Sequence, residues 1–327
     1  MNLKDIGLST SAFAYNMGAA GKNTERKNPA PWTIEEFVDF AFKLGLGGIE
    51  APLMRFIPDL DPSRIKKLKE KLQSRQMFFI MDAELPLDKE EIVKLIPYAK
   101  DLGSPIIRIK SSSILECNRA KLGKPWREHV SGCIEVLKEI KPTLQKVGLR
   151  IAIENHQDLD SNDLLRIVDE VGTDVLGVTF DIGNAFSVCE DPMDFATKLG
   201  SRIINVHIKD YKIYETQSGS LLVRCPIGSG AVDFESVLPA LAGASPDAKM
   251  VIELGALEGR EIKWRQDGFW QEIEPRTEAE NAAFSRRLKY EKAGQAKTPW
   301  EREAPGLDVA DFEVKELEES LIYLKTL

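Results

Sequence analysis

Short apolar runs alternate along the chain with longer segments in which apolar residues recur every three or four positions. The short runs are typical of buried strands, and the periodic segments are typical of amphipathic helices. Eight short runs occur, at residues 6–11, 47–51, 77–81, 106–110, 149–153, 177–180, 203–206 and 250–252. Strands that alternate with helices form a parallel sheet, and eight such units close most naturally into a barrel. The pattern therefore predicts an α/β fold, a (β/α)8 TIM barrel.

Residues 258–307, called the appendage below, interrupt this alternation. The segment is rich in charge and contains several large aromatic residues, among them Trp264, Phe269, Trp270 and Trp300. Aromatic anchors of this kind are typical of interfaces, so we expect a lid or a subunit contact, and hence a homo-oligomer. The predicted organisation is a barrel core at 1–257, the C-terminal insertion at 258–307 and a terminal helix at 308–327 that packs on the barrel. One face of that helix carries Val314, Leu317, Leu321 and Leu324.

Length and charge agree with a single large enzyme-sized domain. The chain has 327 residues, and an eight-unit barrel takes about 250. Its net charge of -8 gives no general attraction to nucleic acid or to anionic membranes, so both are disfavoured as partners. Four cysteines occur without a Cys-x-x-Cys pair, which argues against a zinc knuckle or a disulfide framework. The first residues form no signal leader and no run is long enough to span a bilayer, so we expect a cytoplasmic protein.

Four of the predicted strands end on groups that can bind metal. Glu154, Asp181, His207 and Glu253 each follow an apolar run. Barrel strands deliver their C-terminal residues to one shared mouth, so these side chains are expected to converge. Three carboxylates in a site poor in water repel one another unless a cation neutralises them. An oxygen-rich set with one imidazole suits Mn²⁺, Mg²⁺ or Co²⁺.

Such a metal ion can stabilise the enediolate that forms when a proton is removed next to a sugar carbonyl. Glu154 and Glu253 are the candidate bases, and His156 and Lys209 are candidates for proton transfer or substrate orientation. Glu50 is expected either to contact substrate or to pair with Arg108. The residues expected to contact substrate are Lys209, Glu50, Asn184 and Arg108.

Simpler interpretations exist for several of these residues. An acidic residue after a strand is often only a helix cap. Lys209 and Asp210 can form a surface ion pair, and His129 lies on a charged helical segment where solvation is expected. The Gly-Ser-Gly sequence at 228–230 lacks the Lys-Ser/Thr of a phosphate-binding loop, so we expect a tight turn there.

Five motifs together resemble the xylose-isomerase-like sugar phosphate isomerase/epimerase superfamily, over roughly residues 3–256. They are Ile-Glu-Asn-His at 153–156, Phe-Asp-Ile-Gly-Asn at 180–184, Val-His-Ile-Lys-Asp at 206–210, Ile-Gly-Ser-Gly-Ala-Val-Asp-Phe at 227–234 and Val-Ile-Glu at 251–253. The resemblance implies a (β/α)8 barrel and a small-molecule sugar substrate. It also implies one divalent ion, Mn²⁺ first, held by Glu154, Asp181, His207 and Glu253.

Two departures leave the reaction open between isomerisation or epimerisation and cleavage. Ketose 3-epimerases of this superfamily carry a histidine three residues after the metal-binding aspartate, where this chain has Asn184. The appendage has no counterpart in the compact epimerases. Conversely, Glu154-Asn155-His156 resembles members that cleave or decarboxylate oxidised sugars, including decarboxylases of 3-oxo sugar acids and the metal-binding subunit of C-glycoside deglycosidases. In those relatives the histidine is a candidate base, and the deglycosidase resemblance adds a small partner subunit as an expectation.

Two further function classes have less support in the sequence. An endonuclease of the related abasic-site family builds a three-metal site with several more histidines, whereas this chain has three in all. A non-catalytic binding or scaffold role requires the metal site to be absent or idle, which metal analysis would reveal.

Overall fold

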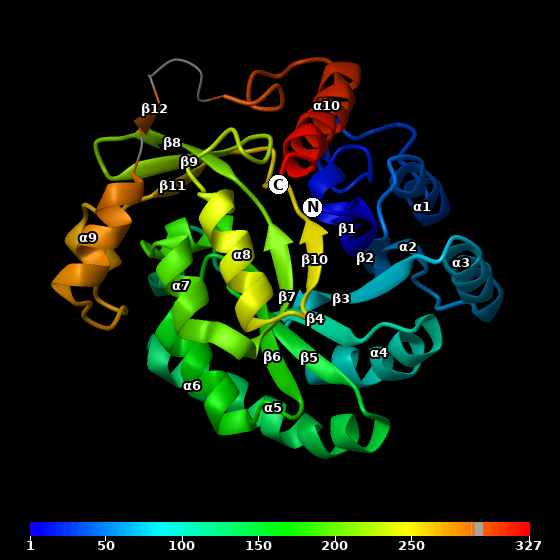
Figure 1. Cartoon of the computed structure of the whole chain (residues 1–327), viewed down its shortest axis with the longest axis horizontal. Coiled ribbons are helices and arrows are strands. Elements are labelled where there is room, and N and C mark those ends of the chain that lie inside the picture. Colours follow the sequence, from blue (N-terminus) through cyan, green and yellow to red (C-terminus); the bar gives the residue numbers. More distant parts are fainter. Residues whose placement is uncertain (289, 292–296) are drawn as a thin grey trace.

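The computed structural model describes residues 1–288, 290–291 and 297–327, and its centre is a closed barrel of eight parallel strands (Figure 1). The order around the barrel is β1-β10-β7-β6-β5-β4-β3-β2, so the predicted TIM barrel is confirmed. The strands are β1 (Ile6–Ser9), β2 (Gly48–Pro52), β3 (Phe78–Pro86), β4 (Ile106–Lys110), β5 (Arg150–Glu154), β6 (Leu176–Asp181), β7 (Ile203–Ile208) and β10 (Lys249–Ile252).

Helices surround the barrel on its outside (Figure 1). They are α1 (Ile34–Lys43), α2 (Leu53–Phe56), α3 (Pro62–Ser74), α4 (Lys89–Leu102), α5 (Trp126–Val147), α6 (Ser161–Val171), α7 (Pro192–Leu199) and α8 (Phe234–Ala244), followed by α9 (Glu278–Arg287) and α10 (Gly306–Leu324). Their N-termini are set locally by caps, as at Thr33 and Asp160, where reciprocal capping boxes satisfy backbone N–H groups. Among the described helices, none is both long and apolar enough to traverse a bilayer.

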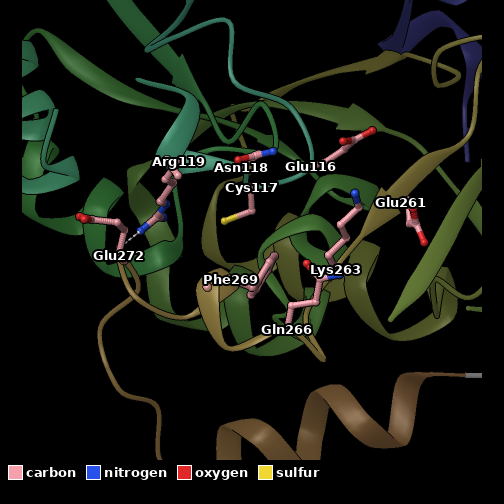
Figure 2. Close-up of a pocket in the computed structure, with 11 residues that line it drawn as sticks. Glu116, Cys117, Asn118, Arg119, Glu261, Lys263, Gln266, Phe269 and Glu272 are labelled. Carbon is pink, nitrogen blue, oxygen red and sulfur yellow. Dashed lines mark hydrogen bonds between the residues drawn. The ribbon is translucent and has the colours of Figure 1, made fainter. Parts of the chain in front are cut away.

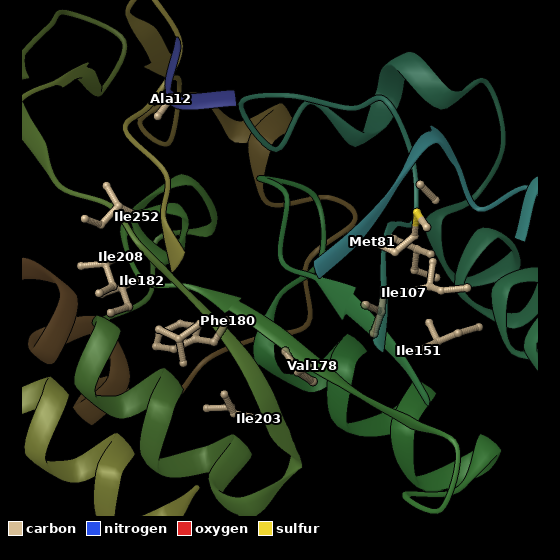
Figure 3. Packing of buried hydrophobic residues seen from close by; sticks show 14 of the residues in the cluster. Ala12, Met81, Ile107, Ile151, Val178, Phe180, Ile182, Ile203, Ile208 and Ile252 are labelled. Carbon is tan, nitrogen blue, oxygen red and sulfur yellow. The ribbon is translucent and has the colours of Figure 1, made fainter. Parts of the chain in front are cut away.

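Alternate residues of each strand face opposite sides of the sheet. This alternation determines which side chains form the hydrophobic core and which form the site. Residues such as Ile107 and Ile151 pack outward against the helices, in the main hydrophobic layer shown in part in Figure 3. The residues between them fill the barrel interior. The layer nearer the N-terminal ends of the strands is an apolar cluster of Ile80, Ile106, Ala152 and Val251. Two residues further along the same strands, the interior changes to charged side chains: Asp82, Arg108, Glu154 and Glu253.

A second, four-stranded sheet lies beyond the barrel, in the order β11-β9-β8-β12. Its strands are β8 (Tyr211–Glu215), β9 (Ser220–Arg224), β11 (Arg260–Ile262) and β12 (Tyr290–Glu291). β8 and β9 form an antiparallel hairpin within the connection after β7, a segment that contains none of the eight apolar runs. The appendage contributes β11 and β12, which pair with β9 and β8 respectively.

The terminal helix α10 contacts the short 3₁₀ turn Thr10–Phe13, which follows the first barrel strand. Leu317, Leu321 and Leu324 join the main hydrophobic layer, as the apolar stripe suggested. The same helix also buries two carboxylates. Glu313 accepts hydrogen bonds from the backbone N–H groups of Tyr15 and Asn16 at 2.8 and 3.0 Å, and Glu316 accepts from Arg224 Nε at 2.6 Å. Buried charges of this type require specific partners, which a hydrophobic pattern does not reveal.

Two local expectations change once the contacts are known. His129 is not solvated, because it is 8% exposed and its Nε2 lies 3.2 Å from Ser111 Oγ. Asp210 is also buried, and its carboxylate accepts hydrogen bonds from the N–H groups of Gly228, Gly230 and Val232 at 2.8 to 3.1 Å. Asp210 therefore holds the Gly-Ser-Gly segment in place. Gly228 has φ of 85°, as expected for a tight turn.

Candidate metal centre

Four neighbouring barrel strands bring the predicted ligands together. Glu154 ends β5, Asp181 ends β6, His207 lies in β7 and Glu253 directly follows β10. The strands are adjacent in the barrel, and Asp181 is paired in register with His207. One candidate ligand atom from each of the four side chains lies within 4.8 Å of the others.

His207 Nδ1 occupies the middle of this cluster. It lies 3.2 Å from Glu253 Oε2 and 3.9 Å from both Glu154 Oε1 and Asp181 Oδ2. All four residues are buried, with exposures of 5% or less. The sequence alone placed these residues at one mouth, and the structure adds that a donor atom of each lies close to a donor atom of the other three.

The donor atoms fit a divalent ion because several of them lack another partner. Within the described part of the chain, Oε1 of Glu154, Nδ1 of His207 and Oε2 of Glu253 are buried without a hydrogen-bond partner, and Oε2 of Glu154 has only its ion pair with Arg108. A buried polar atom left unpaired costs about 1–3 kcal/mol, so such a group of atoms needs an explanation. A cation among three carboxylates and one imidazole would satisfy them together.

Glu50 lies behind His207, a contact that the sequence did not predict. Its carboxylate oxygens lie 2.9 and 3.0 Å from His207 Nε2, and it also accepts a hydrogen bond from Asn205 Nδ2 at 3.2 Å. Burial lowers the pKa of His207, but the charges of Glu50 and Glu253 outweigh it and raise the pKa to about 10. A carboxylate on the distal nitrogen commonly orients a metal-binding histidine. The geometry of Glu50 therefore favours positioning of His207 over contact with substrate or with Arg108.

Arg108 connects the site to β3. Its Nη1 lies 2.7 Å from Asp82 Oδ1, and its Nη2 forms an ion pair with Glu154. Burial raises the pKa of Glu154 to about 7, although Arg108 and His207 act in the opposite direction. Asp82 was not recognised in the sequence. It pairs in register with Arg108 across β3 and β4, a relation that only the folded barrel reveals.

Lys209 is a buried part of the site and not a surface ion pair with Asp210. Its Nζ lies 2.5 Å from Asp181 Oδ2 and 2.9 Å from Glu253 Oε1, and the residue is 4% exposed. Burial alone would lower the pKa of Lys209, but these two carboxylates raise it well above its ordinary value. Lys209 therefore provides positive charge between two of the candidate ligands.

Two asparagines fix Asp181. Asn155 exchanges hydrogen bonds with the backbone N–H and C=O of Asp181, at 2.7 and 2.9 Å. Asn184 donates from Nδ2 to Asp181 Oδ2 at 2.8 Å, and Tyr211 donates its hydroxyl to Asn184 at 3.3 Å. Asn184 thus orients a candidate ligand from the position where ketose 3-epimerases carry histidine.

His156 lies on the loop that follows Glu154. The residue is half-buried, and within the described chain its buried Nδ1 has no hydrogen-bond partner. Burial, followed by the charges of Lys110 and Arg108, holds the pKa of His156 well below its usual range. The imidazole is therefore neutral at neutral pH.

Comparison with known proteins identifies the fold family. A family model described as a xylose isomerase-like TIM barrel matches residues 38–272. A 3-oxo-isoapionate decarboxylase of Pectobacterium atrosepticum is 21% identical over 253 residues, which cover 76% of this chain and 84% of that protein. An uncharacterised protein of Methanocaldococcus jannaschii is 28% identical over 204 residues, 60% of this chain and 61% of its own.

Solved structures show the same fold at low identity. A D-psicose 3-epimerase from Clostridium cellulolyticum H10 superposes with a TM-score of 0.59 at 14% identity, covering 95% of this chain and 99% of its own. A 3-keto-D-glucoside 4-epimerase from E. coli has a TM-score of 0.56 at 13% identity, covering 87% of this chain and 97% of its own. With a family model matched over most of the barrel, the chain belongs to the xylose isomerase-like TIM-barrel family.

Proposed function

We propose that the protein is a divalent-metal-dependent enzyme that isomerises or epimerises a keto-sugar or sugar derivative through an enediolate. The observation that carries this proposal is the cluster of buried donor atoms from Glu154, His207 and Glu253 at the barrel mouth, several of which have no hydrogen-bond partner in the described chain. Together with Asp181, these residues would hold one ion, Mn²⁺ as first choice and Mg²⁺ or Co²⁺ as alternatives. When bound, such an ion polarises a substrate carbonyl and offsets the negative charge of the enediolate.

The two glutamates are suited to different halves of a proton transfer. Burial would raise the pKa of Glu253, but Lys209 and His207 hold it well below the usual range, so this carboxylate stays ionised and can remove a proton. The pKa of Glu154, raised by burial to about 7, allows it to carry a proton near neutral pH. Titratable groups whose environments separate their pKa values in this way are typical acid and base partners. The strands β5 and β10, which carry the two glutamates at their ends, are not adjacent in the barrel. One glutamate can therefore remove a proton from one face of a bound sugar, and the other can return a proton to the opposite face.

Lys209, Arg108 and Asn184 are proposed to bind and orient the substrate. Each already contacts a carboxylate of the cluster. Arginine and lysine offer several N–H donors, so they can keep a carboxylate in place and still reach a sugar oxygen. Their positive charge would also favour a substrate that becomes negative during the reaction.

A second candidate function is carbon–carbon cleavage of an oxidised sugar, such as decarboxylation of a 3-oxo sugar acid or the reaction of a C-glycoside deglycosidase subunit. The 21% identical relative is named a decarboxylase and is matched over 84% of its length. Loss of CO₂ from a 3-oxo acid leaves the same type of enediolate or enolate, which one protonation completes. His156, whose buried Nδ1 has no hydrogen-bond partner in the described chain, would then be the candidate that relays this proton from water to the enolate.

A deuterium exchange experiment separates these reactions. The full chain is reconstituted with Mn²⁺ and incubated in D₂O with a panel of ketoses and 3-oxo sugar acids, and products are followed by NMR and mass spectrometry. Deuterium next to a carbonyl with an unchanged carbon count supports isomerisation or epimerisation, whereas release of CO₂ or of an aglycone supports cleavage. Absence of exchange and of cleavage with every substrate contradicts both proposals.

A further inference from the structure

A polar pocket lies between the connection from β4 to α5 and the appendage. Its volume is about 230 Å³. Glu116, Cys117 and Asn118 lie along one side, and Lys263, Gln266 and Phe269 lie along the opposite side (Figure 2). The side chain of Lys263 extends across the pocket toward the loop that carries Glu116 (Figure 2). None of these six residues belongs to the candidate metal centre.

The lining combines groups that recognise a polyhydroxylated ring. Glu116 supplies a carboxylate acceptor, Lys263 an ammonium donor, and Asn118 and Gln266 supply amides that both donate and accept. Phe269 adds an apolar face. In the described parts of the chain, neither Glu116 nor Lys263 takes part in an ion pair, so both remain available to a ligand. A pocket with a few convergent polar groups and one aromatic face is typical of a small-molecule site.

Hydrogen bonds join one wall of this pocket to the loop that follows Glu154. The N–H of Cys117 donates to the carbonyl oxygen of Gln157 at 2.9 Å, and the N–H of Glu116 donates to Gln157 Oε1 at 3.1 Å. Gln157 directly follows His156 and is three residues from Glu154. Three residues of chain span at most about 11 Å, so the pocket wall is joined to the metal centre over a short distance.

Arg119 joins both sides of the pocket to the loop that follows Glu154. This buried arginine donates to the carbonyl oxygen of Asp158 at 2.8 and 3.0 Å and to that of Glu272, in the appendage, at 2.6 Å (Figure 2). Glu116 and Gln157 also adopt left-handed backbone conformations, with φ of 61° and 69°. Such conformations cost of order 1–3 kcal/mol in residues other than glycine and persist where surrounding contacts impose them. The pocket is therefore held in shape by the fold.

We propose that this pocket is a second carbohydrate subsite, so that the substrate is a glycoside with its oxidised unit at the metal centre and a second sugar unit between Glu116 and Lys263. This proposal rests on the proposed function at the metal centre. It assigns a role to the appendage: β11 and the segment after it supply one wall of the substrate site.

The test compares the binding of one-unit and two-unit sugars to the Mn²⁺-loaded full chain. The probes are 3-oxo-glucose and the 3-oxo forms of cellobiose, maltose, lactose and sucrose, and the readout is tryptophan fluorescence, because Trp264 and Trp270 adjoin the lining residues. We expect at least one disaccharide to bind at least about tenfold more tightly than 3-oxo-glucose. The double variant Lys263→Ala/Gln266→Ala should lose most of this preference. The control Gln271→Ala changes an equally exposed glutamine of the same segment that does not line the pocket, and it should keep the preference.

Equal affinity for one-unit and all two-unit probes would overturn the subsite, as would an unchanged preference in the double variant. Deuterium exchange into 3-oxo-glucose by the wild-type protein is recorded in parallel. If exchange occurs without a disaccharide preference, the subsite is wrong and the proposed reaction stands. If the preference depends on Lys263 and Gln266 but no exchange occurs with any probe, the subsite stands and the proposed reaction is wrong.

Discussion

Glu154 and Glu253 face the same point but experience different surroundings. Arg108 is the cation next to Glu154, whereas Lys209 and the imidazole of His207 both lie against Glu253. The two carboxylates therefore differ in their readiness to hold a proton, although they have the same chemistry. This difference is what the proposed acid and base roles require.

Glu154→Gln and Glu253→Gln should each lower turnover by about 10²- to 10⁴-fold while the fold survives. The amide keeps the size of the side chain but cannot exchange a proton and is a weaker metal ligand. Turnover of the best substrate and the far-UV circular dichroism spectrum measure the two effects. Glu215→Gln, at an exposed glutamate of β8, serves as control. Wild-type turnover in either of the two site variants would contradict the proposed site.

His129 should make the stability of the protein depend on pH. Burial, together with Lys124 and Arg119, lowers the pKa of His129 to about 4, whereas an unfolded chain has a histidine pKa of about 6.5. Between these values the unfolded state binds a proton that the folded state does not, so this contribution to the free energy of unfolding falls as pH falls from 6.5 to 4. Urea midpoints at pH 7 and pH 5 should therefore differ less for His129→Gln than for the wild type. An equal decrease in both proteins would show that His129 does not titrate as described.

At the scale of elements, Arg224 joins three segments around the barrel mouth. It donates to Glu316 of α10, to the carbonyl oxygen of Gly255 at 2.8 Å and to that of Ala12 at 3.2 Å. Gly255 lies two residues after Glu253, so this contact also supports the strand end that carries a candidate ligand.

Arg224→Met should lower the free energy of unfolding by about 3–5 kcal/mol, because it leaves the buried Glu316 carboxylate without its cation. The matched control is Arg265→Met, which removes an exposed ion pair with Glu215 and should change stability by about 0–1 kcal/mol. Urea unfolding of both variants provides the comparison. An equal decrease in the free energy of unfolding in the two variants would contradict a larger contribution of the buried ion pair.

The barrel elements could be predicted because parallel strands are covered on both sides and appear as apolar runs. The run at 106–110 coincides with β4, and the runs that precede Glu154 and Asp181 were placed within one or two residues. The β8–β9 hairpin was missed although its two strands flank a Gly-containing turn at 216–219. A strand pair inside a barrel connection lies outside the regular alternation, so counting that alternation does not detect it.

At the scale of the whole molecule, the sequence placed the four candidate ligands at one mouth because barrel topology brings strand ends together. The partners behind them could not be predicted. Contacts such as Glu50 with His207, or Asp82 with Arg108, depend on strand register and on side-chain direction inside the barrel. The position of the appendage likewise depends on its pairing with β9 and on the Arg119 contacts, neither of which a local pattern reveals.

The most direct test of the central claim is titration of the metal-free protein with Mn²⁺, followed by electron paramagnetic resonance. We predict one bound ion per chain in the wild type and in the exposed control Asp267→Asn, and loss of that ion in Asp181→Asn. Asparagine retains the shape of aspartate but removes a charge from the cluster. Binding that is absent from the wild type, or that is unchanged in Asp181→Asn, would contradict the proposed metal centre.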